Sequence, residues 1–521
     1  MYDLIIKDGL IVDGSGRPPF LADLGTKGER IYSVGGLEGA AAKRVITAGG
    51  LVVSPGFIDV HGHSDLTLLV DRRAPSKIRQ GITTEVGGNC GFSGAPALSQ
   101  AQKKLESRKI TYGLTSSWSY LEEYLEILQS GGLGINFVPL VGQGNLRASI
   151  VGYENRPATP EEIEEMKSLL VRSLEEGAFG LSSGLLYPPG CFTPMEELIA
   201  LTRVVADFEG IYASHIRGEG DRLLEAVTEA LAITRESRVK LQISHLKTAG
   251  KKNHPKIDEV FQLIDEALTE GLDLGTDRYP YAAAATDLDA VLPSWVYEGG
   301  IEEEIRRLKD PSSRQRLKKE IEDTDWDEIM ISGVAHKGNE WMEGKRISEV
   351  AEFQETTPFE CLLDLLIEEK AGTSAIYFSM SESNLRRILK QPYCMIGSDA
   401  SARHESGLLV EGKVHPRTFG AFPRVLAKYV REEKELRLEE AIHKMTGQPA
   451  VRFGLPDRGL IGEGMFADLV IFDPRLIKDT ATYQTPYQYP EGIEYVILNG
   501  RIAVDQGIPT GILSGKVVRK H

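Results

Sequence analysis

Residues 55–65, PGFIDVHGHSD, predict a buried strand that ends in two histidines. The apolar run is long enough for one strand, and His61 and His63 stand two positions apart. Because successive side chains of a strand point to opposite faces, both imidazoles are expected on the same face. A glycine-containing loop follows. A metal ion held by the pair would therefore lie at the carboxyl end of the strand rather than inside the core.

Around this segment, short apolar runs alternate with amphipathic stretches, the pattern of βα units in a parallel sheet. Eight strands are expected, at residues 57–60, 83–86, 135–141, 179–183, 211–214, 240–244, 272–277 and 394–398. Helices are expected at residues 120–129, 160–176, 195–209, 223–236 and 257–270. The count predicts an α/β fold built on a closed (β/α)8 TIM barrel.

The two ends of the chain favour β structure, with Asn499-Gly500 as a strong hairpin signal. Neither end is large enough to bury a sheet alone, so we expect residues 1–56 and 455–521 to pair as one small composite β-sandwich beside a catalytic barrel of residues 57–454. About 115 residues separate the last two expected barrel strands, too many for a simple connection. A polar segment at about 287–346 within them is expected to form a lid over the barrel mouth.

Composition excludes several function classes. With 521 residues the chain exceeds the usual size of a single core. A net charge of -16 leaves no basic excess to neutralise phosphates, which argues against nucleic-acid or anionic-membrane partners. No apolar run approaches a membrane span and no secretory hydrophobic region begins the sequence, so a cytoplasmic location is expected. Four cysteines in so long a chain predict no disulfide framework.

Six potential metal ligands fall at the carboxyl ends of the expected strands. In a (β/α)8 barrel these ends meet at one face, where catalytic residues gather, so positions far apart in the sequence converge on one pocket. Imidazoles, a thiolate and a carboxylate are ligands that zinc prefers, and a set of this size could hold one or two ions with a water position left open. The six are His61, His63, Cys90, His215, His245 and Asp399.

Two groups of motifs resemble a known family. Residues 53–63, followed by Gly397-Ser398-Asp399, resemble the amidohydrolase superfamily, and the two β ends resemble its composite sandwich. More narrowly, five segments resemble the D-aminoacylase (N-acyl-D-amino-acid deacylase) family, and the likeness covers nearly the whole chain. They are Gly88-Asn89-Cys90-Gly91, SSGLLYPPG at 182–190, Ser214-His215-Ile216-Arg217, Ser244-His245-Leu246-Lys247 and His415-Pro416-Arg417.

The resemblance implies zinc-dependent hydrolysis of the amide bond of N-acyl-D-amino acids, giving a D-amino acid and a carboxylate. It implies a tighter zinc ion on Cys90, His215 and His245. His61 and His63, with Asp399, form a second and often weaker site. Asp399 would accept a proton from the metal-activated water and return it to the leaving amine, because an amide anion leaves poorly.

The resemblance also implies residues that hold a small-molecule substrate, an N-acyl amino acid. Lys247 and Tyr187 match residues that bind its carboxylate, and Arg217 and Tyr281 are further candidates for the same pocket. Lys247 lies two residues beyond His245 on the same strand face, which favours a fixed cation at the barrel mouth. Asp287 and Asp289 would disfavour an anionic substrate side chain, so neutral, apolar or basic side chains are expected. No coiled-coil or swapped segment indicates an oligomeric interface.

Other functions remain open. Hydantoinases and dihydroorotases of the superfamily bridge two metals with a carboxylated lysine at the end of strand four, where this chain has Ser182-Ser183-Gly184. A D-dipeptidase would share the linear amide chemistry. A deaminase would use one metal and a glutamate beyond strand five; Glu219 stands nearby, but Cys90 would then have no role. A non-catalytic scaffold is the remaining alternative, and stoichiometric zinc would argue against it.

Overall fold

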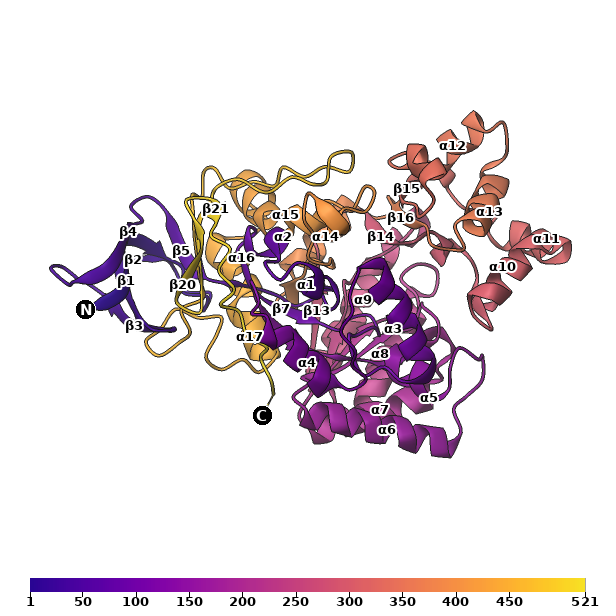
Figure 1. The fold of residues 1–521 in the computed structure, drawn as a ribbon, viewed down its shortest axis with the longest axis horizontal. Helices are drawn as coiled ribbons and strands as arrows, with labels where there is room; N and C mark the ends of the chain where they lie inside the picture. Colours follow the sequence, from indigo (N-terminus) through magenta and orange to yellow (C-terminus); the bar gives the residue numbers. More distant parts are fainter. Residues whose placement is uncertain (521) are drawn as a thin grey trace.

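The computed structural model describes residues 1–520, which form a central barrel, a sheet at one end and an inserted subdomain at the other (Figure 1). Eight barrel strands are present, the third of them in two pieces. In chain order they are β6 (Phe57–Asp59), β7 (Ile82–Gly87), β8 (Asn136–Pro139) with β9 (Val141–Gly142), β10 (Gly180–Gly184), β11 (Ile211–His215), β12 (Lys240–Ile243), β13 (Leu274–Arg278) and β17 (Cys394–Ile396). The predicted strands are confirmed.

The barrel closes between its first and last strands. β6, β7 and β8 pair in parallel, and a second parallel sheet runs from β9 to β17. Beyond the strand ends, Gly62 and Ala400 form an isolated parallel bridge, and the Asp399 amide donates to the His61 carbonyl at 2.8 Å. Strand β7 is buried along its whole length, as expected for a parallel sheet covered on both sides.

Helices cover the barrel strands, and the five predicted ones are confirmed. They are α4 (Leu121–Ser130), α6 (Pro160–Glu175), α7 (Met195–Asp207), α8 (Leu223–Ser237) and α9 (Ile257–Thr269). The remaining helices around the barrel are α1 (Thr67–Val70), α2 (Pro75–Ile78), α3 (Ser99–Thr111), α5 (Gln143–Ile150), α14 (Glu382–Lys390), α15 (Arg417–Arg424), α16 (Leu438–Met445) and α17 (Gly447–Arg452). None of the described helices is both long and apolar enough to cross a bilayer.

Strands from both ends of the chain share one nine-stranded sheet. They are β1 (Tyr2–Ile11), β2 (Phe20–Lys27), β3 (Arg30–Gly35), β4 (Ala42–Thr47), β5 (Val52–Pro55), β18 (Leu469–Phe472), β19 (Ile493–Leu498), β20 (Arg501–Asp505) and β21 (Ile508–Pro509). β5 and β18 join the two ends as an antiparallel pair. Asn499 and Gly500 both have positive φ in the turn between β19 and β20, as a tight hairpin requires. Figure 1 shows the indigo and yellow strands side by side.

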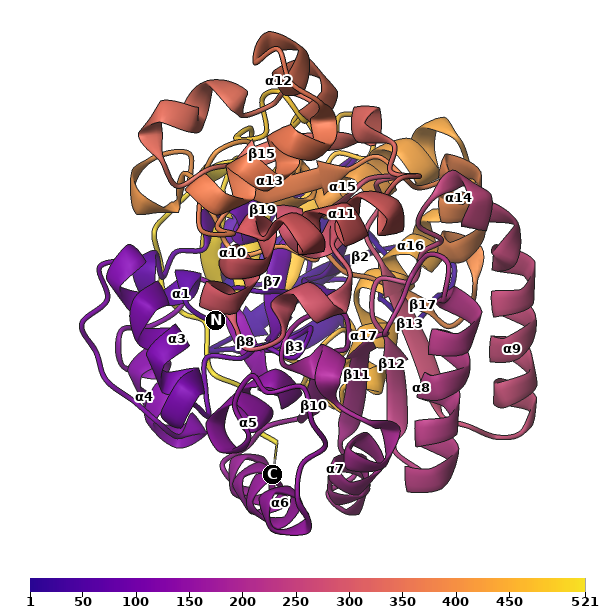
Figure 2. The same cartoon turned by 90° about the vertical axis from the view of Figure 1, so that its right-hand side faces the viewer.

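The insertion between β13 and β17 has its own sheet and its own apolar core. β16 (Ser374–Tyr377) lies between β14 (Ala284–Asp287) and β15 (Ile329–Gly333). Its helices are α10 (Ile301–Lys309), α11 (Pro311–Glu320), α12 (Ile347–Phe353) and α13 (Pro358–Glu368). The core reaches Ala375, so this subdomain extends past the boundary near residue 346 expected from the sequence. Viewed from that end, α10 and α11 stand in front of the barrel strands (Figure 2).

A buried lysine connects the two strands that close the barrel. Lys77, on α2, is fully buried, and its Nζ lies 2.7 Å from Asp59 Oδ2 and 3.0 Å from Glu85 Oε2. The same ammonium donates to Ser398 Oγ and to the Ala400 carbonyl, both at 2.8 Å. Asp59 ends β6 and Ser398 follows β17, so one cation ties together both sides of the closure. Removing it would leave two buried carboxylates without a counter-charge, which is far more costly than losing a surface pair.

We therefore expect Lys77→Met to lower the free energy of unfolding by about 3–5 kcal/mol, because a broken buried ion pair leaves its partners uncompensated. Urea denaturation followed by circular dichroism would measure this. Lys103→Met, which removes an exposed ammonium, is the matched control. Adding Glu85→Gln to Lys77→Met should recover part of the loss. A Lys77→Met protein as stable as the control would refute this account of the closure.

Candidate metal centre

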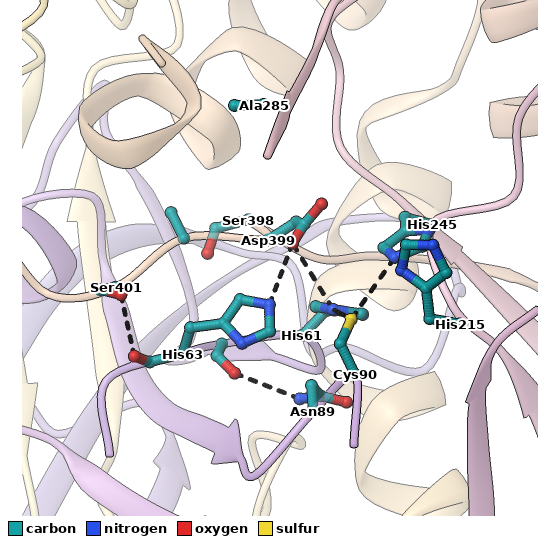
Figure 3. A network of polar contacts seen from close by, with 12 residues as sticks. His61, His63, Asn89, Cys90, His215, His245, Ala285, Ser398, Asp399 and Ser401 are labelled. Atoms are coloured by element: carbon teal, nitrogen blue, oxygen red, sulfur yellow. Dashed lines mark hydrogen bonds and ion pairs between the residues drawn. The ribbon is translucent and has the colours of Figure 1, made fainter. Parts of the chain in front are cut away.

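The six predicted ligands meet at the carboxyl ends of the barrel strands (Figure 3). Three overlapping groups have ligand atoms within 4.8 Å of one another. His61 belongs to two of them, one with Cys90 and the other with Asp399, and His245 also belongs to two. The groups are His61 with Cys90 and His245, His61 with His63 and Asp399, and His215 with Glu219 and His245. The cluster is thus continuous, with imidazoles shared between neighbouring groups.

Distances within the cluster show where the donor atoms point. Cys90 Sγ lies 3.3 Å from His61 Nε2 and 3.5 Å from His245 Nε2. His63 Nε2 lies 3.0 Å from Asp399 Oδ1, and His61 Nε2 lies 3.6 Å from the same oxygen. Cys90 is therefore grouped with His61 and His245, whereas the family resemblance implied a set with His215 and His245. The division into a tighter and a weaker site stays a prediction.

An unusual backbone conformation positions three of these residues at the barrel mouth. Cys90, His245 and Asp399 have φ values of 52°, 36° and 51°, in the left-handed region that residues with a Cβ rarely adopt. Strain of this kind persists only where the surrounding structure enforces it, and it gathers at functional sites. Each of the three follows the end of a barrel strand, so the unusual φ turns its side chain back over the barrel mouth.

Between the two histidines of the opening motif, only glycine fits. A Cβ at Gly62 would lie 2.2 Å from the Glu85 carboxyl carbon, too close for any side chain. β6 ends at Asp59, so His61 and His63 stand beyond the strand rather than on it. Their rings are 5.1 Å apart and both approach Asp399. The predicted convergence of the pair holds, although a loop and not a strand provides it.

The charged surroundings of Cys90 favour its thiolate form. Burial opposes ionisation of its thiol, but the neighbouring imidazoles of His61, His215 and His245 outweigh burial and hold the pKa of Cys90 well below its usual range. In turn, burial disfavours the charged imidazole of His61, while Cys90 and Asp277 raise the pKa of His61 well above its ordinary value. A thiolate, unlike a thiol, is a good ligand for a soft divalent cation.

Asp399 is the carboxylate of the cluster, and Arg417 holds its other oxygen. Arg417 Nη1 lies 2.8 Å from Asp399 Oδ2, and both side chains are almost completely buried. Burial opposes ionisation of Asp399, but Arg417, His245 and His63 keep its pKa well below the usual range. Arg417 also stacks at 4.5 Å on the ring of Tyr279, whose hydroxyl is buried without a hydrogen-bond partner in the described chain.

Lys247 lies beside the cluster, as predicted, and is held by an acidic neighbour. Its Nζ lies 2.7 Å from His245 Nδ1 and forms a short contact with Glu219 Oε1. Glu219 Oε1 also lies 2.9 Å from His245 Nδ1. Burial opposes ionisation of Glu219, but Lys247 and the two neighbouring histidines keep its pKa well below the ordinary value. The pair places a cation and a carboxylate together at the end of β12.

Tyr187 also lies beside the cluster, whereas Arg217 and Tyr281 do not. The Tyr187 ring is 4.9 Å from that of His215, and its hydroxyl meets Thr286 Oγ1 at 2.9 Å. Arg217 is held by Glu229 at 2.9 Å and by two backbone carbonyls. The Tyr281 hydroxyl donates to Asp479 at 3.2 Å. The expectation that these last two residues face the substrate pocket is corrected, because scaffold contacts already engage their polar groups.

Three residues join the site that sequence reasoning did not assign to it: Glu219, Arg417 and Tyr279. Glu219 follows the ligand His215 by four positions, in the loop after β11. Arg417 ends the His415-Pro416-Arg417 motif, and its backbone amide donates to His415 Nδ1 at 3.0 Å, which fixes the start of α15. The motif itself was the available signal for Arg417. For Tyr279, the only signal was its position directly after β13.

The donor set fits a metal ion. Both ring nitrogens of His215 are buried without a hydrogen-bond partner among residues 1–520, whereas Nδ1 of His61 lies 3.2 Å from Asp277 Oδ1. Unpaired buried polar atoms are costly, and a cation would satisfy one of the two nitrogens of His215. A thiolate, imidazoles and a carboxylate that converge within bonding reach of a common point match the preference of zinc, and the set is large enough for one or two ions.

Comparison with known proteins agrees with this class. The amidohydrolase family matches residues 44–504, and the chain belongs to that family. A D-aminoacylase from Alcaligenes xylosoxydans xylosoxydans is 36% identical over 100% of this chain and 98% of its own. An N-acyl-D-glutamate deacylase of the same organism is 35% identical over 99% and 96%. The crystal structure of N-acyl-D-glutamate deacylase from Bordetella bronchiseptica, with zinc and a phosphonate inhibitor, superposes with a TM-score of 0.84 at 33% identity over 99% of each chain.

Cys90 distinguishes the site from a cluster of histidines alone, so its removal should weaken metal binding. We expect Cys90→Ala to lower zinc affinity at least about tenfold, since loss of a direct ligand exceeds the effect of losing a supporting contact. Chelator competition with zinc analysis would measure it. Cys361→Ala, at a buried cysteine in the inserted subdomain, is the control and should match the wild type. Equal zinc affinity in both variants would remove Cys90 from the ligand set.

Proposed function

We propose that this protein is a zinc-dependent N-acyl-D-amino-acid deacylase that releases a D-amino acid and a carboxylate. The observation that carries the proposal is the convergence of Cys90, His61, His63, His245 and Asp399 at the barrel mouth. Relatives that match the chain over their full length act on N-acyl-D-amino acids by name. The D configuration rests on those relatives, and the hydrolytic chemistry rests on the donor set.

The proposed role of Asp399 is proton transfer. Zinc, when bound, polarises a carbonyl group and makes water nucleophilic near neutral pH. Asp399 stays ionised beside Arg417 and His63, so it can accept the proton of the attacking water. It then returns that proton to the nitrogen of the leaving amine, which departs as a neutral group. Arg417 holds the carboxylate in place during both transfers.

The substrate's own carboxylate would be held by cations at the mouth. Lys247 is fixed beside the ligand His245, and because Glu219 and His245 each engage one of its three N–H donors, the third is left for a substrate. Tyr187 offers a hydroxyl on the other side of His215. Arg417 and the unpartnered hydroxyl of Tyr279 provide a second anchoring point near Asp399. These contacts would orient the amide bond and set which enantiomer fits.

Competing reactions are less well supported. A cyclic amidase that uses a carboxylated lysine would need it at the end of β10, where the chain has Ser182, Ser183 and Gly184. A deaminase would give Glu219 a catalytic role, but here Glu219 pairs with Lys247. A scaffold would not retain a buried thiolate among histidines. A D-dipeptidase remains compatible with the same residues, since its substrate is also a linear amide.

Asp399→Asn should retain zinc but lose at least about 10²-fold in kcat, because the amide cannot accept the proton. Zinc content and the hydrolysis rate of N-acetyl-D-leucine would be measured on the same preparation. Asp364→Asn, at an exposed position in the inserted subdomain, is the control and should keep the wild-type rate. An Asp399→Asn variant that keeps more than about a tenth of the wild-type rate would refute the assigned role.

A substrate panel tests the reaction class. The zinc-loaded enzyme should hydrolyse N-acetyl-D-leucine faster than N-acetyl-L-leucine, a D-dipeptide or a hydantoin. It should also prefer N-acetyl-D-leucine to N-acetyl-D-glutamate, since Asp287 and Asp289 bring negative charge to the inserted subdomain. Product release would be followed by chromatography, with the Asp399→Asn protein as background. Faster turnover of the hydantoin would favour the cyclic amidase, and faster turnover of the glutamate substrate would reverse the side-chain preference.

A further inference from the structure

A cavity of about 410 Å³ opens beside the metal centre. His63 and Asp65 form its inner end, and the loop and helix α3 that follow β7 form one wall. Cavities that take molecules of drug size span roughly 300–1,000 Å³. An acetyl group would leave most of this volume empty, so the cavity is large enough for a longer substituent next to the reacting amide.

Two cations in this cavity lack a partner. Lys104 and Arg108 line it from α3, and no carboxylate of the described chain lies within 4.0 Å of either. The charged side chains of Asp65 and Arg403, which also line the cavity, already have partners. Asp65 accepts from two backbone amides at 3.2 Å and 3.1 Å, and Arg403 pairs with Glu411 at 2.8 Å.

Asp287 is the remaining charged side chain that lines the cavity. It acts on both cations at longer range, and Asp289 also acts on Lys104, so two cations meet two carboxyl groups. Burial and the neighbouring Asp287 raise the pKa of Asp289 to about 7, which weakens its negative charge. Burial and the neighbouring Arg108 guanidinium lower the pKa of Lys104 to about 8. An anion placed between Lys104 and Arg108 would relieve both of these unfavourable effects.

Phe92 connects the cations to the reaction site. Lys104 Nζ lies 4.6 Å from the centre of the Phe92 ring, and the Arg108 guanidinium carbon lies 5.9 Å from it. Phe92 and the ligand His63 line the same cavity. An aliphatic chain could therefore run past the Phe92 ring from the metal centre to the two cations. The ring would exclude water from its methylene groups.

We propose that this cavity binds the acyl half of the substrate, and that Lys104 and Arg108 select acyl groups ending in a carboxylate, such as succinyl. This inference rests on the proposed deacylase function. Lys247 and Arg417, the anchors assigned to the amino-acid carboxylate, come from the β12 and β17 sides of the barrel. The cavity begins at His63, which follows β6, and at the loop after β7 that contains Phe92 and Ser93. The two halves of an amide extend in opposite directions, so the acyl half points toward Phe92.

The test compares N-succinyl-D-leucine with N-acetyl-D-leucine in the zinc-loaded enzyme. The wild type should have the higher kcat/KM for the succinyl substrate. The double variant Lys104→Met/Arg108→Gln should lower the ratio of succinyl to acetyl kcat/KM at least about tenfold, because a charge-assisted hydrogen bond is lost. Its rate on the acetyl substrate should stay within about twofold of wild type. Lys103→Met, an exposed lysine on the same helix, is the matched control and should leave the ratio unchanged.

Three results would overturn the proposal: an unchanged ratio in the double variant, an equal fall in the Lys103→Met control, or a loss confined to N-acetyl-D-glutamate. The last result would assign the two cations to the amino-acid side chain instead. Calorimetric measurement of succinate binding tests the anion site independently of whether the enzyme hydrolyses the amide. If no N-acyl-D-leucine is hydrolysed, the proposed function fails, but tighter binding of succinate by the wild type than by the double variant would still support the anion site. Equal succinate binding would refute it.

Discussion

A single buried ammonium holds the barrel closed where the chemistry is placed. Lys77 bonds to Asp59, two residues before His61, and to Ser398, which immediately precedes Asp399. The first and last strands of the barrel therefore cannot shift against each other without breaking a desolvated ion pair. His61, His63 and Asp399 depend on that register, because the contacts among them cross the same seam. The cost of burying the charge is offset only by its full set of partners, so the network enforces one arrangement of the mouth.

Above this closure, charges alternate in sign across short distances. A thiolate lies among imidazoles, a carboxylate lies between His63 and Arg417, and Glu219 joins Lys247 to His245. Neighbouring histidines, with Arg417 at Asp399 and Lys247 at Glu219, stabilise the charged forms of Cys90, Asp399 and Glu219, and this is how burial is overcome at these three groups. The strained backbone at Cys90, His245 and Asp399 belongs to the same arrangement. The charged groups and the backbone together hold the donor atoms of the site in one arrangement.

Sequence pattern predicted the barrel well, because strand burial and helix amphipathicity leave a direct periodic signal. It also predicted that the candidate ligands converge, since the carboxyl ends of parallel strands share one face and each candidate stands at such an end. The conformation of a loop leaves no periodic pattern in the sequence from which side-chain directions could be predicted. That is why Arg217, two residues after His215, was expected to face the pocket but is held by Glu229. For the same reason Tyr281 was expected at the pocket, although Asp479 engages its hydroxyl. The extent of the insertion was underestimated because β16 is short and returns to pair with distant β14.

The pairing of β5 with β18 has a consequence for the way this chain is made. The first five strands are synthesised almost a whole chain length before the strand that covers their last edge. Until β18 emerges, β5 presents unpaired backbone N–H and C=O groups, and such an edge can recruit a strand from another molecule. The barrel strands, which lie between β5 and β18 in the chain, are all synthesised while that edge is still unpaired. The risk of misassembly during synthesis therefore depends on how long the β5 edge stays unpaired. It does not depend on the stability of the finished protein.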